Sequence, residues 1–347
     1  MGTLNAIPPI IYILEATSIC GGVKVVFEQA RELKKRGLDI KIASKGPYPA
    51  WLDFSVPFKQ VSCIEEIFKE NAIFILTFFN HILKAKAWGV LDRCIHLCQG
   101  YEGDYEEARP FLKKIEEAYK IPVLRVTVSP RLARYLHLKF GINVLSVGQA
   151  IDHSVFYPEK HPHFSPPFKI LIMGSFTNSV KRLKDALAAA TLVKNKLPVR
   201  LIRISLSETK KEEMRLYPID EYYQYLKPQQ VADIMRSAHA LIMSSGPGEG
   251  FGLPVIEAMA CGLPVIMTDI DSFREITANK YPISLAPVGD INTMASFLEK
   301  LLTDANLFFN ARKSGIEIAS AYTYNRVGEK LINLLRHKCR SQNSFLS

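Results

Sequence analysis

The chain has 347 residues, 48% of them hydrophobic, and a formal net charge of +10 at pH 7. Its length suits two domains of ordinary size, each with a buried core. No apolar run is long enough to span a bilayer, and the first nine residues lack the features of a secretory signal, so we expect a cytoplasmic protein. The basic residues are spread out without interleaved aromatic residues, which argues against a nucleic-acid partner and leaves open a peripheral contact with the inner face of a membrane.

The first part of the chain begins with a strand, a glycine loop, a helix and a second strand. Residues 9–14 are apolar, Gly21 and Gly22 follow, and apolar residues then recur at helical spacing up to Leu33, before a second apolar run at 40–43. This order is typical of a parallel α/β sheet. Gly22 could let the backbone approach a phosphate or a sugar. The dinucleotide fingerprint G-x-G-x-x-G is absent, so an NAD enzyme is not expected.

Six cysteines are scattered along the chain, and only Cys94 and Cys98 lie close together, with His96 between them. On a strand these three side chains would share one face, so a metal cluster is conceivable. The apolar neighbours Ile95 and Leu97 instead indicate a buried strand. We therefore expect no metal there.

The same alternation continues and falls into two series. Further strands of the first series are predicted at 72–76, 93–98, 123–128 and 143–147, with helices at 106–119 and 130–140, and strands of the second series at 168–173, 199–204, 240–243, 264–268 and 283–285. Residues 157–167 between them are too rich in proline for a helix or an interior strand, and they are interpreted as a linker. The prediction is an α/β protein with two Rossmann-like domains, residues 1–157 and 165–321, that face a central cleft.

A glycine-rich loop in the second domain carries the clearest chemical signal. It follows the strand at 240–243, and Pro254 then stands where a helix can begin, because a missing N–H costs nothing there. The free amides at such a helix start attract a phosphate or a sugar oxygen. Glu249 and Glu257 would repel a diphosphate, so they are better suited to accepting hydrogen bonds from hydroxyls, as in a nucleotide-sugar. The alternative is that Glu257 only complements the helix dipole and the glycines only form a turn.

The run from Glu249 to Pro264, Glu-Gly-Phe-Gly-Leu-Pro-Val-Ile-Glu-Ala-Met-Ala-Cys-Gly-Leu-Pro, resembles the signature of the retaining glycosyltransferases with the GT-B fold, the glycosyl transferases group 1 or family four. The segment from Val128 to Pro158 resembles the end of that family's first domain. Residues 99–102, Gln-Gly-Tyr-Glu, resemble a variant found in rhamnosyltransferase-like members. The resemblance spans nearly the whole chain and implies that a C-terminal helix at 322–340 packs back onto the first domain.

The resemblance assigns roles to residues of the loop. It implies that Glu249 contacts the transferred sugar and that Glu257 holds the ribose. It also implies that sugar hydroxyls meet the amides of three successive residues: Phe251, Gly252 and Leu253.

Cations after the strand at 168–173 would face the departing diphosphate. The family commonly has Gly-Arg followed by a lysine at this place, and both bind the diphosphate. Here Ser175 stands at the arginine position, while Lys181 fits the lysine and Arg182 is the candidate substitute. The resemblance therefore makes Glu249 and Lys181 the catalytic candidates.

On the first domain, Gln99 stands where many members carry a histidine that contacts the donor sugar. Its amide can bind a hydroxyl, although a structural role is equally open. Glu102 is a candidate acceptor contact. The family's reaction needs no protein base, and Asp269-Ile270-Asp271 is interpreted as a loop or helix cap, so neither a metal nor a cofactor is expected.

The expected function is that of a metal-independent retaining glycosyltransferase of the hexosyltransferase type. It would move a sugar from a nucleotide-sugar donor to a glycan or lipid-linked acceptor in cell-surface polysaccharide synthesis. Two alternatives stay open: a nucleotide-sugar epimerase on the same scaffold, and a catalytically silent glycan-binding homologue. The donor's base and sugar are not readable, because residues 206–225 show no decodable pattern.

Overall fold

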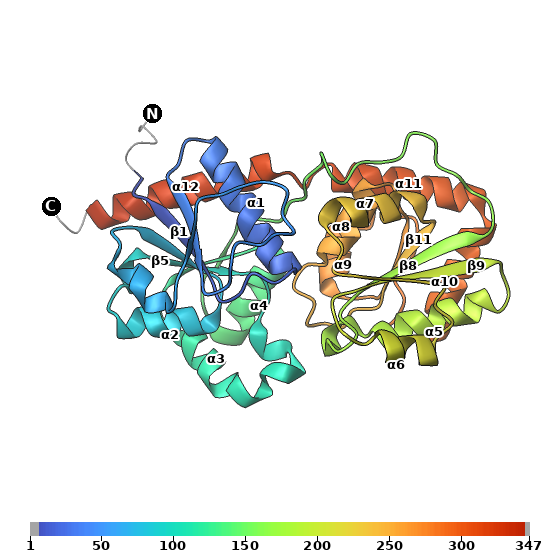
Figure 1. Ribbon diagram of the computed structural model, residues 1–347, viewed down its shortest axis with the longest axis horizontal. Coiled ribbons are helices and arrows are strands. Elements are labelled where there is room, and N and C mark those ends of the chain that lie inside the picture. The colour runs from blue at the N-terminus through green and yellow to red at the C-terminus, as the bar shows by residue number, and fades with distance from the viewer. Residues whose placement is uncertain (1–6, 344–347) are drawn as a thin grey trace. The chain divides into compact units, whose positions relative to one another are not determined.

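The computed structural model describes residues 7–343, with side chains up to Cys339. The chain forms two compact units (Figure 1). One comprises the chain up to Ala150 together with the segment from Thr323 onward, and the other is Ile151–Tyr322. No helix of the described residues is long and apolar enough to cross a membrane.

The described part of the first unit contains a seven-stranded parallel sheet of order β3-β2-β1-β4-β5-β6-β7. Its central strands are buried on both faces, as apolar strands covered by helices on both sides should be. The strands are β1 (Ile10–Leu14), β2 (Ile40–Ser44), β3 (Phe58–Gln60), β4 (Ile73–Leu76), β5 (Cys94–Cys98), β6 (Leu124–Thr127) and β7 (Leu145–Ser146). The α-helices are α1 (Gly21–Lys35), α2 (Phe79–Ala87), α3 (Leu112–Lys120), α4 (Pro130–Phe140) and α12 (Tyr324–Asn343).

Local signals set the ends of α4. The Ser129 hydroxyl accepts a hydrogen bond from the amide of Leu132, Pro130 is the first helical residue, and Gly141 ends the helix with φ 68°. These ends match the predicted helix at 130–140. The helix predicted at 106–119 is different: residues Glu106–Phe111 form 3₁₀ turns that contain Pro110, and the α-helix begins only at Leu112. Proline has no N–H for an α-helical bond, which accounts for the delayed start.

The C-terminal helix α12 packs along α1, so the last part of the chain belongs to the first unit (Figure 1). Arg36, at the end of α1, donates to the backbone carbonyl of Asn325 at 2.8 Å and to its side-chain oxygen at 2.6 Å. A Cβ on Gly328 would lie 2.8 Å from Nε of Arg36. A glycine at this position therefore allows the two helices to approach closely.

The second unit contains a five-stranded parallel sheet of order β10-β9-β8-β11-β12. Together the two parallel sheets confirm the predicted α/β class. The strands are β8 (Phe168–Gly174), β9 (Val199–Ser205), β10 (Glu221–Gln224), β11 (Ala240–Met243) and β12 (Val265–Met267). The α-helices are α5 (Leu183–Lys194), α6 (Lys210–Leu216), α7 (Pro228–Ser237), α8 (Leu253–Ala260), α9 (Asp271–Thr277), α10 (Ile291–Thr303) and α11 (Ala305–Ala319).

Three segments of the second unit differ from the sequence-based interpretation. Residues 206–225 contain α6 and the edge strand β10. The strand predicted at 283–285 is reduced to an isolated bridge between Thr268 and Ala286. The proline-rich residues 157–167 pack within the second unit, where the Phe164 ring lies 4.6 Å from that of Phe308 and the Glu159 carbonyl accepts a hydrogen bond from Arg312. An aromatic contact and a hydrogen bond thus attach this proline-rich segment to the second unit.

Candidate functional site

The loops that follow β8 and β11 are bound to each other. The amide of Gly246 donates to the carbonyl of Val180 at 2.7 Å. The Ser244 hydroxyl donates to the carbonyls of Lys181 and Arg182, at 3.0 and 2.8 Å. Because β8 and β11 are parallel neighbours, their carboxyl ends meet at one edge of the sheet, where α/β proteins commonly bind ligands.

Lys181 and Glu249 form an ion pair at this edge. Nζ of Lys181 lies 2.6 Å from Oε2 of Glu249, and the side chains are 24% and 9% exposed. The Ser245 hydroxyl donates to the same oxygen at 2.8 Å, and the Ser272 hydroxyl donates to the Glu249 carbonyl at 3.3 Å. The carboxylate is therefore held in one place, and the ammonium keeps an exposed side that can face a further anion.

The start of α8 lies directly after this ion pair. Gly252 precedes the helix with φ 95°, and a Cβ there would lie 2.5 Å from Cε1 of Phe273, so only glycine fits. Among the described residues, the amides of Phe251, Gly252 and Leu253 donate no hydrogen bond. These three adjacent donors are available to the oxygens of a ligand. The predicted helix after the glycine loop is thus present.

Glu257 lies in α8, one turn after Leu253, and is only 5% exposed. It shares this helix with the free amides. Arg182 has a left-handed backbone with φ 47° and occupies the N-cap position of α5. Its guanidinium lies 2.8 Å from the Asp185 carboxylate and is 39% exposed. Arg182 is therefore near Lys181 in the chain, but its charge is directed toward Asp185.

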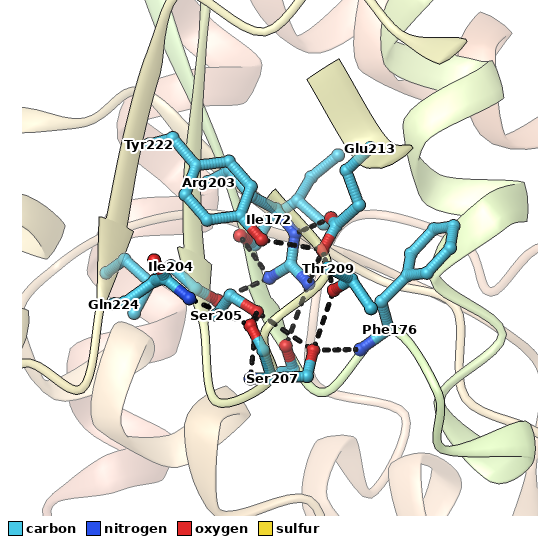
Figure 2. A network of polar contacts seen from close by, with 11 residues as sticks. Ile172, Phe176, Arg203, Ile204, Ser205, Ser207, Thr209, Glu213, Tyr222 and Gln224 are labelled. Atoms are coloured by element: carbon cyan, nitrogen blue, oxygen red, sulfur yellow. Dashed lines mark hydrogen bonds and ion pairs between the residues drawn. The ribbon is translucent and has the colours of Figure 1, made fainter. Parts of the chain in front are cut away.

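A buried polar network supports the carboxyl ends of β8 and β9, and the sequence analysis missed it (Figure 2). Arg203 on β9 is fully buried, and its Nε lies 2.6 Å from Oε2 of Glu213 on α6. The same guanidinium donates to the carbonyl of Gly174 at 2.8 Å, and the hydroxyls of Thr209 and Tyr222 each donate to Glu213 at 2.7 Å. Arg203 thereby fixes the end of β8, immediately before the loop that carries Lys181. The signal in the sequence was Arg203 between Ile202 and Ile204, in the apolar middle of a strand.

In the first unit, the structure brings Gln99 and Gly22 together. The Gln99 side-chain amide donates to the Gly22 carbonyl at 3.1 Å, between the end of β5 and the first turn of α1. Glu102 is more strongly engaged: one oxygen accepts from the amide of Phe79 at 3.1 Å and the other from the Tyr119 hydroxyl at 2.6 Å. Burial raises the pKa of Glu102, against the lowering effect of the Tyr119 hydrogen bond. These contacts favour a structural role for the Glu102 side chain.

A second cluster in the first unit was missed by the sequence analysis. Glu15 follows β1 and interacts with Nε2 of buried His81 at 3.2 Å and with Lys45, which follows β2. The hydrogen bond from His81, and then that from Lys45, outweigh desolvation and lower the pKa of Glu15 to about 2. Glu15 is therefore ionised at neutral pH. Its position directly after a buried strand was the available signal.

No group of three potential metal-ligating side chains occurs among residues 7–339. Cys94, His96 and Cys98 are buried on β5, and Nδ1 of His96 accepts a hydrogen bond from Arg125 at 2.8 Å. Burial raises the pKa of each thiol to about 12, so both stay protonated at neutral pH. These residues therefore belong to the core.

Residues 167–304 match the family model of the glycosyl transferases group 1. A phosphatidyl-myo-inositol mannosyltransferase from Mycobacterium leprae is 32% identical over 103 residues, which are 30% of this chain and 28% of that protein. The namesake protein from Mycolicibacterium smegmatis is 25% identical over 213 residues, 57% of this chain and 51% of that protein. The matches thus span between about a quarter and half of these relatives.

Among solved structures, Anabaena HepE in complex with UDP-glucose superposes with a TM-score of 0.76 at 11% sequence identity. The superposition covers 95% of this chain and all of that one. Both parallel-sheet units therefore have counterparts in that structure. The chain has the GT-B fold, and residues 167–304 of its second unit are similar to the glycosyl transferases group 1 family.

Proposed function

We propose that the protein is a retaining glycosyltransferase that moves a sugar from a nucleoside-diphosphate donor to a glycan or lipid-linked acceptor, in polysaccharide or glycolipid synthesis. The observation that carries this proposal is the ion pair between Lys181 and Glu249 next to the free amides that begin α8. An ordered carboxylate suits sugar hydroxyls, and amide donors suit sugar or phosphate oxygens. The family match over 167–304 covers all of these residues and supports the same proposal.

Each group has a separate task in this proposal. Glu249 accepts a hydrogen bond from a hydroxyl of the transferred sugar, and the amides of residues 251–253 donate to its oxygens. The exposed side of the Lys181 ammonium faces the diphosphate, where negative charge grows as the glycosidic bond breaks. Glu257 accepts from the ribose hydroxyls. In the first unit, Gln99 binds a donor hydroxyl while its bond to Gly22 positions it.

The anomeric configuration is retained if the acceptor hydroxyl attacks from the same face from which the leaving group departs. A diphosphate oxygen takes the proton of that hydroxyl. The Glu249 carboxylate already accepts from Lys181 and Ser245, which favours binding over proton abstraction. The anomeric configuration of the product, followed by NMR from a donor of known configuration, tests this step. An inverted product would rule it out. We also propose that no metal is required, which a transfer assay with excess chelator checks.

Glu257→Ala is expected to weaken donor binding by about tenfold or more, because a hydrogen bond to a charged group contributes about 1.5–3 kcal/mol. A thermal-shift series with UDP, GDP, dTDP, ADP and their sugars first identifies the nucleotide, since a ligand that binds only the folded state raises its stability. Titration of that nucleotide against both proteins then gives the affinity ratio. Equal affinities would remove Glu257 from the donor site.

Acceptor dependence separates the proposal from its two alternatives. A glycosyltransferase transfers the sugar only when an acceptor is present, whereas an epimerase of this fold releases a new free hexose without one. A catalytically silent glycan-binding homologue turns over no donor. Incubating the identified donor with and without glycan or lipid-linked acceptors, and measuring free sugar and transferred sugar, gives a different result for each.

We further propose that the first unit contacts an anionic membrane surface through the start of α3. Phe111 is 52% exposed and Leu112 is 36% exposed, and Lys113 and Lys114 follow them at the surface. A lysine near an anionic surface contributes about 1 kcal/mol, so Lys113→Ala with Lys114→Ala should weaken vesicle binding by about tenfold or more. Sedimentation with phosphatidylglycerol vesicles measures the affinity of each variant for the vesicles. The exposed pair Lys34→Ala with Lys35→Ala on α1 is the charge-matched control, and equal losses would exclude a specific contact.

A further inference from the structure

A groove of about 590 Å³ lies in the second unit, away from the candidate donor site. It is bordered by the residues at the amino ends of β8 and β11, by the C-terminal end of α7 and by the proline-rich segment 157–167. The loops with Lys181 and Glu249 follow the carboxyl ends of the same strands. Because β8 has seven residues, the two ends of that strand are about 20 Å apart.

Positive side chains predominate in the lining of this groove. Four cations and two carboxylates line it: Lys169, Arg200, Arg236 and Arg312, with Glu159 and Asp233. The Asp233 carboxylate is paired with Arg236. Arg312 donates to the backbone carbonyls of Gly262 and Glu159, which carry no formal charge. The ion pairs within the groove therefore leave net positive charge.

Two of these cations are free enough to meet a ligand. Lys169 makes no ion pair among the described residues. Arg200 is 49% exposed, and its pairing with Glu221 at 3.2 Å involves one nitrogen, Nη2, of a guanidinium that has several other donors. A lysine and an arginine together can neutralise and hydrogen-bond an oxyanion.

His239 adds a neutral donor to the lining. The residue is 5% exposed, and its Nδ1 accepts a hydrogen bond from the amide of Lys169 at 3.0 Å. In the neutral ring the proton is therefore on Nε2, which has no hydrogen-bond partner among the described residues. Burial, followed by the charges of His163 and Lys169, lowers the pKa of His239 to about 4. At neutral pH His239 is thus uncharged, and its Nε2–H is buried.

We propose that this groove is a second ligand site that binds a phosphate group, carried either by a small phosphorylated molecule or by a lipid headgroup. Lys169 and Arg200 supply the charge, and the buried, unpartnered Nε2–H of His239 is the remaining donor of the residues that line the groove. The volume is in the range of small-molecule sites and exceeds that of a single phosphate. Since the groove and the donor loops lie at opposite ends of one sheet, this site goes beyond the proposed transfer reaction and does not depend on it.

Calorimetric titration of the full chain with inorganic phosphate and with glycerol phosphate, at neutral pH, tests the proposal. Lys169→Ala with Arg200→Ala should weaken binding by at least about tenfold, because both charged donors are lost. The charge-matched control is Lys196→Ala with Lys300→Ala, which removes two exposed lysines outside the groove and should leave the affinity unchanged. His239→Asn keeps an acceptor for the Lys169 amide but lacks Nε2, and it should also bind more weakly.

Lys181→Ala distinguishes this groove from the donor site. It should keep the phosphate binding that Lys169→Ala/Arg200→Ala loses. Loss of binding in Lys181→Ala together with full binding in Lys169→Ala/Arg200→Ala would place the phosphate at the donor loops and overturn the proposal. Vesicles of phosphatidylcholine, alone or with an equal amount of phosphatidylglycerol, separate the two sources. If phosphatidylglycerol increases vesicle binding only when the groove is intact, and glycerol phosphate does not bind there, the ligand is a lipid headgroup. If glycerol phosphate binds at the groove and phosphatidylglycerol gives no such increase, the ligand is a small molecule. If the groove variant matches its control with every probe, there is no such site.

Discussion

Glu249→Ala is expected to lower the turnover number of sugar transfer by about a hundredfold or more, the effect of removing a preorganised polar contact to a transition state. The carboxylate is 9% exposed and is held by Lys181 at 2.6 Å and by the Ser245 hydroxyl at 2.8 Å. Its removal would both delete the hydroxyl acceptor and release the ammonium from its position. Steady-state kinetics with the identified donor and acceptor measure the change.

Two further variants show whether Glu249 acts together with Lys181. Lys181→Ala should also lower turnover, and the double variant should lose less than the product of the two single losses, because each residue orders the other. The matched control is Glu299→Ala, which removes a carboxylate from an exposed ion pair with Lys196 on the same unit. Unchanged turnover in Glu249→Ala, in a folded protein that binds donor, would disprove the site assignment.

Glu213→Ala is expected to lower the free energy of unfolding of the second unit by about 3–5 kcal/mol, the cost of breaking a buried ion pair on one side. Arg203 and Glu213 are both fully buried, with 2.6 Å between Nε and Oε2. The carboxylate also accepts the hydroxyls of Thr209 and Tyr222, so its loss leaves three polar groups without their acceptor (Figure 2). Denaturant unfolding followed by circular dichroism measures the change.

Glu299→Ala serves as the control for this prediction too. Its pair with Lys196 is exposed, at 61% for the lysine and 38% for the glutamate, and such pairs contribute about 0–1 kcal/mol. Arg203→Leu combined with Glu213→Leu should lower the free energy of unfolding by less than twice the loss in Glu213→Ala, because no charge is then left buried. A loss below about 1 kcal/mol in Glu213→Ala would mean that the network contributes little to folding.

Local patterns predicted the elements whose ends are chemically marked. Ser129 and Pro130 mark the start of the 11-residue helix α4 and Gly141 marks its end, so the sequence alone was sufficient for that helix. By contrast, β10 has only intermediate and exposed residues, so it carries no hydrophobic signal and exists because it pairs with β9 at the sheet edge. Pro110 accounts for the difference between the helix predicted at 106–119 and the later start of α3.

The two candidate residues Lys181 and Glu249 show what the sequence alone can and cannot predict. Their types and neighbours in the chain selected both as candidates, because a glycine loop before a helix and a lysine after a buried strand each have a local signature. Their ion pair could not be predicted, because 68 positions separate Lys181 from Glu249 in the chain. Their loops meet only because β8 and β11 pair in parallel. The sequence around Ser245 likewise does not indicate that its hydroxyl binds Glu249.

By itself, then, the sequence determined the α/β class, the glycine loop with its helix start, and the residue types available for donor chemistry, because each of these depends on contacts within about a dozen residues. Only the tertiary structure decided which charges meet. It paired Lys181 with Glu249, turned Arg182 toward Asp185 and buried Arg203 against Glu213. It also gathered the basic groove at the opposite end of β8 from segments far apart in the chain. Charge pairing depends on distances in space, which the order of the strands in the sheet sets and no local pattern encodes.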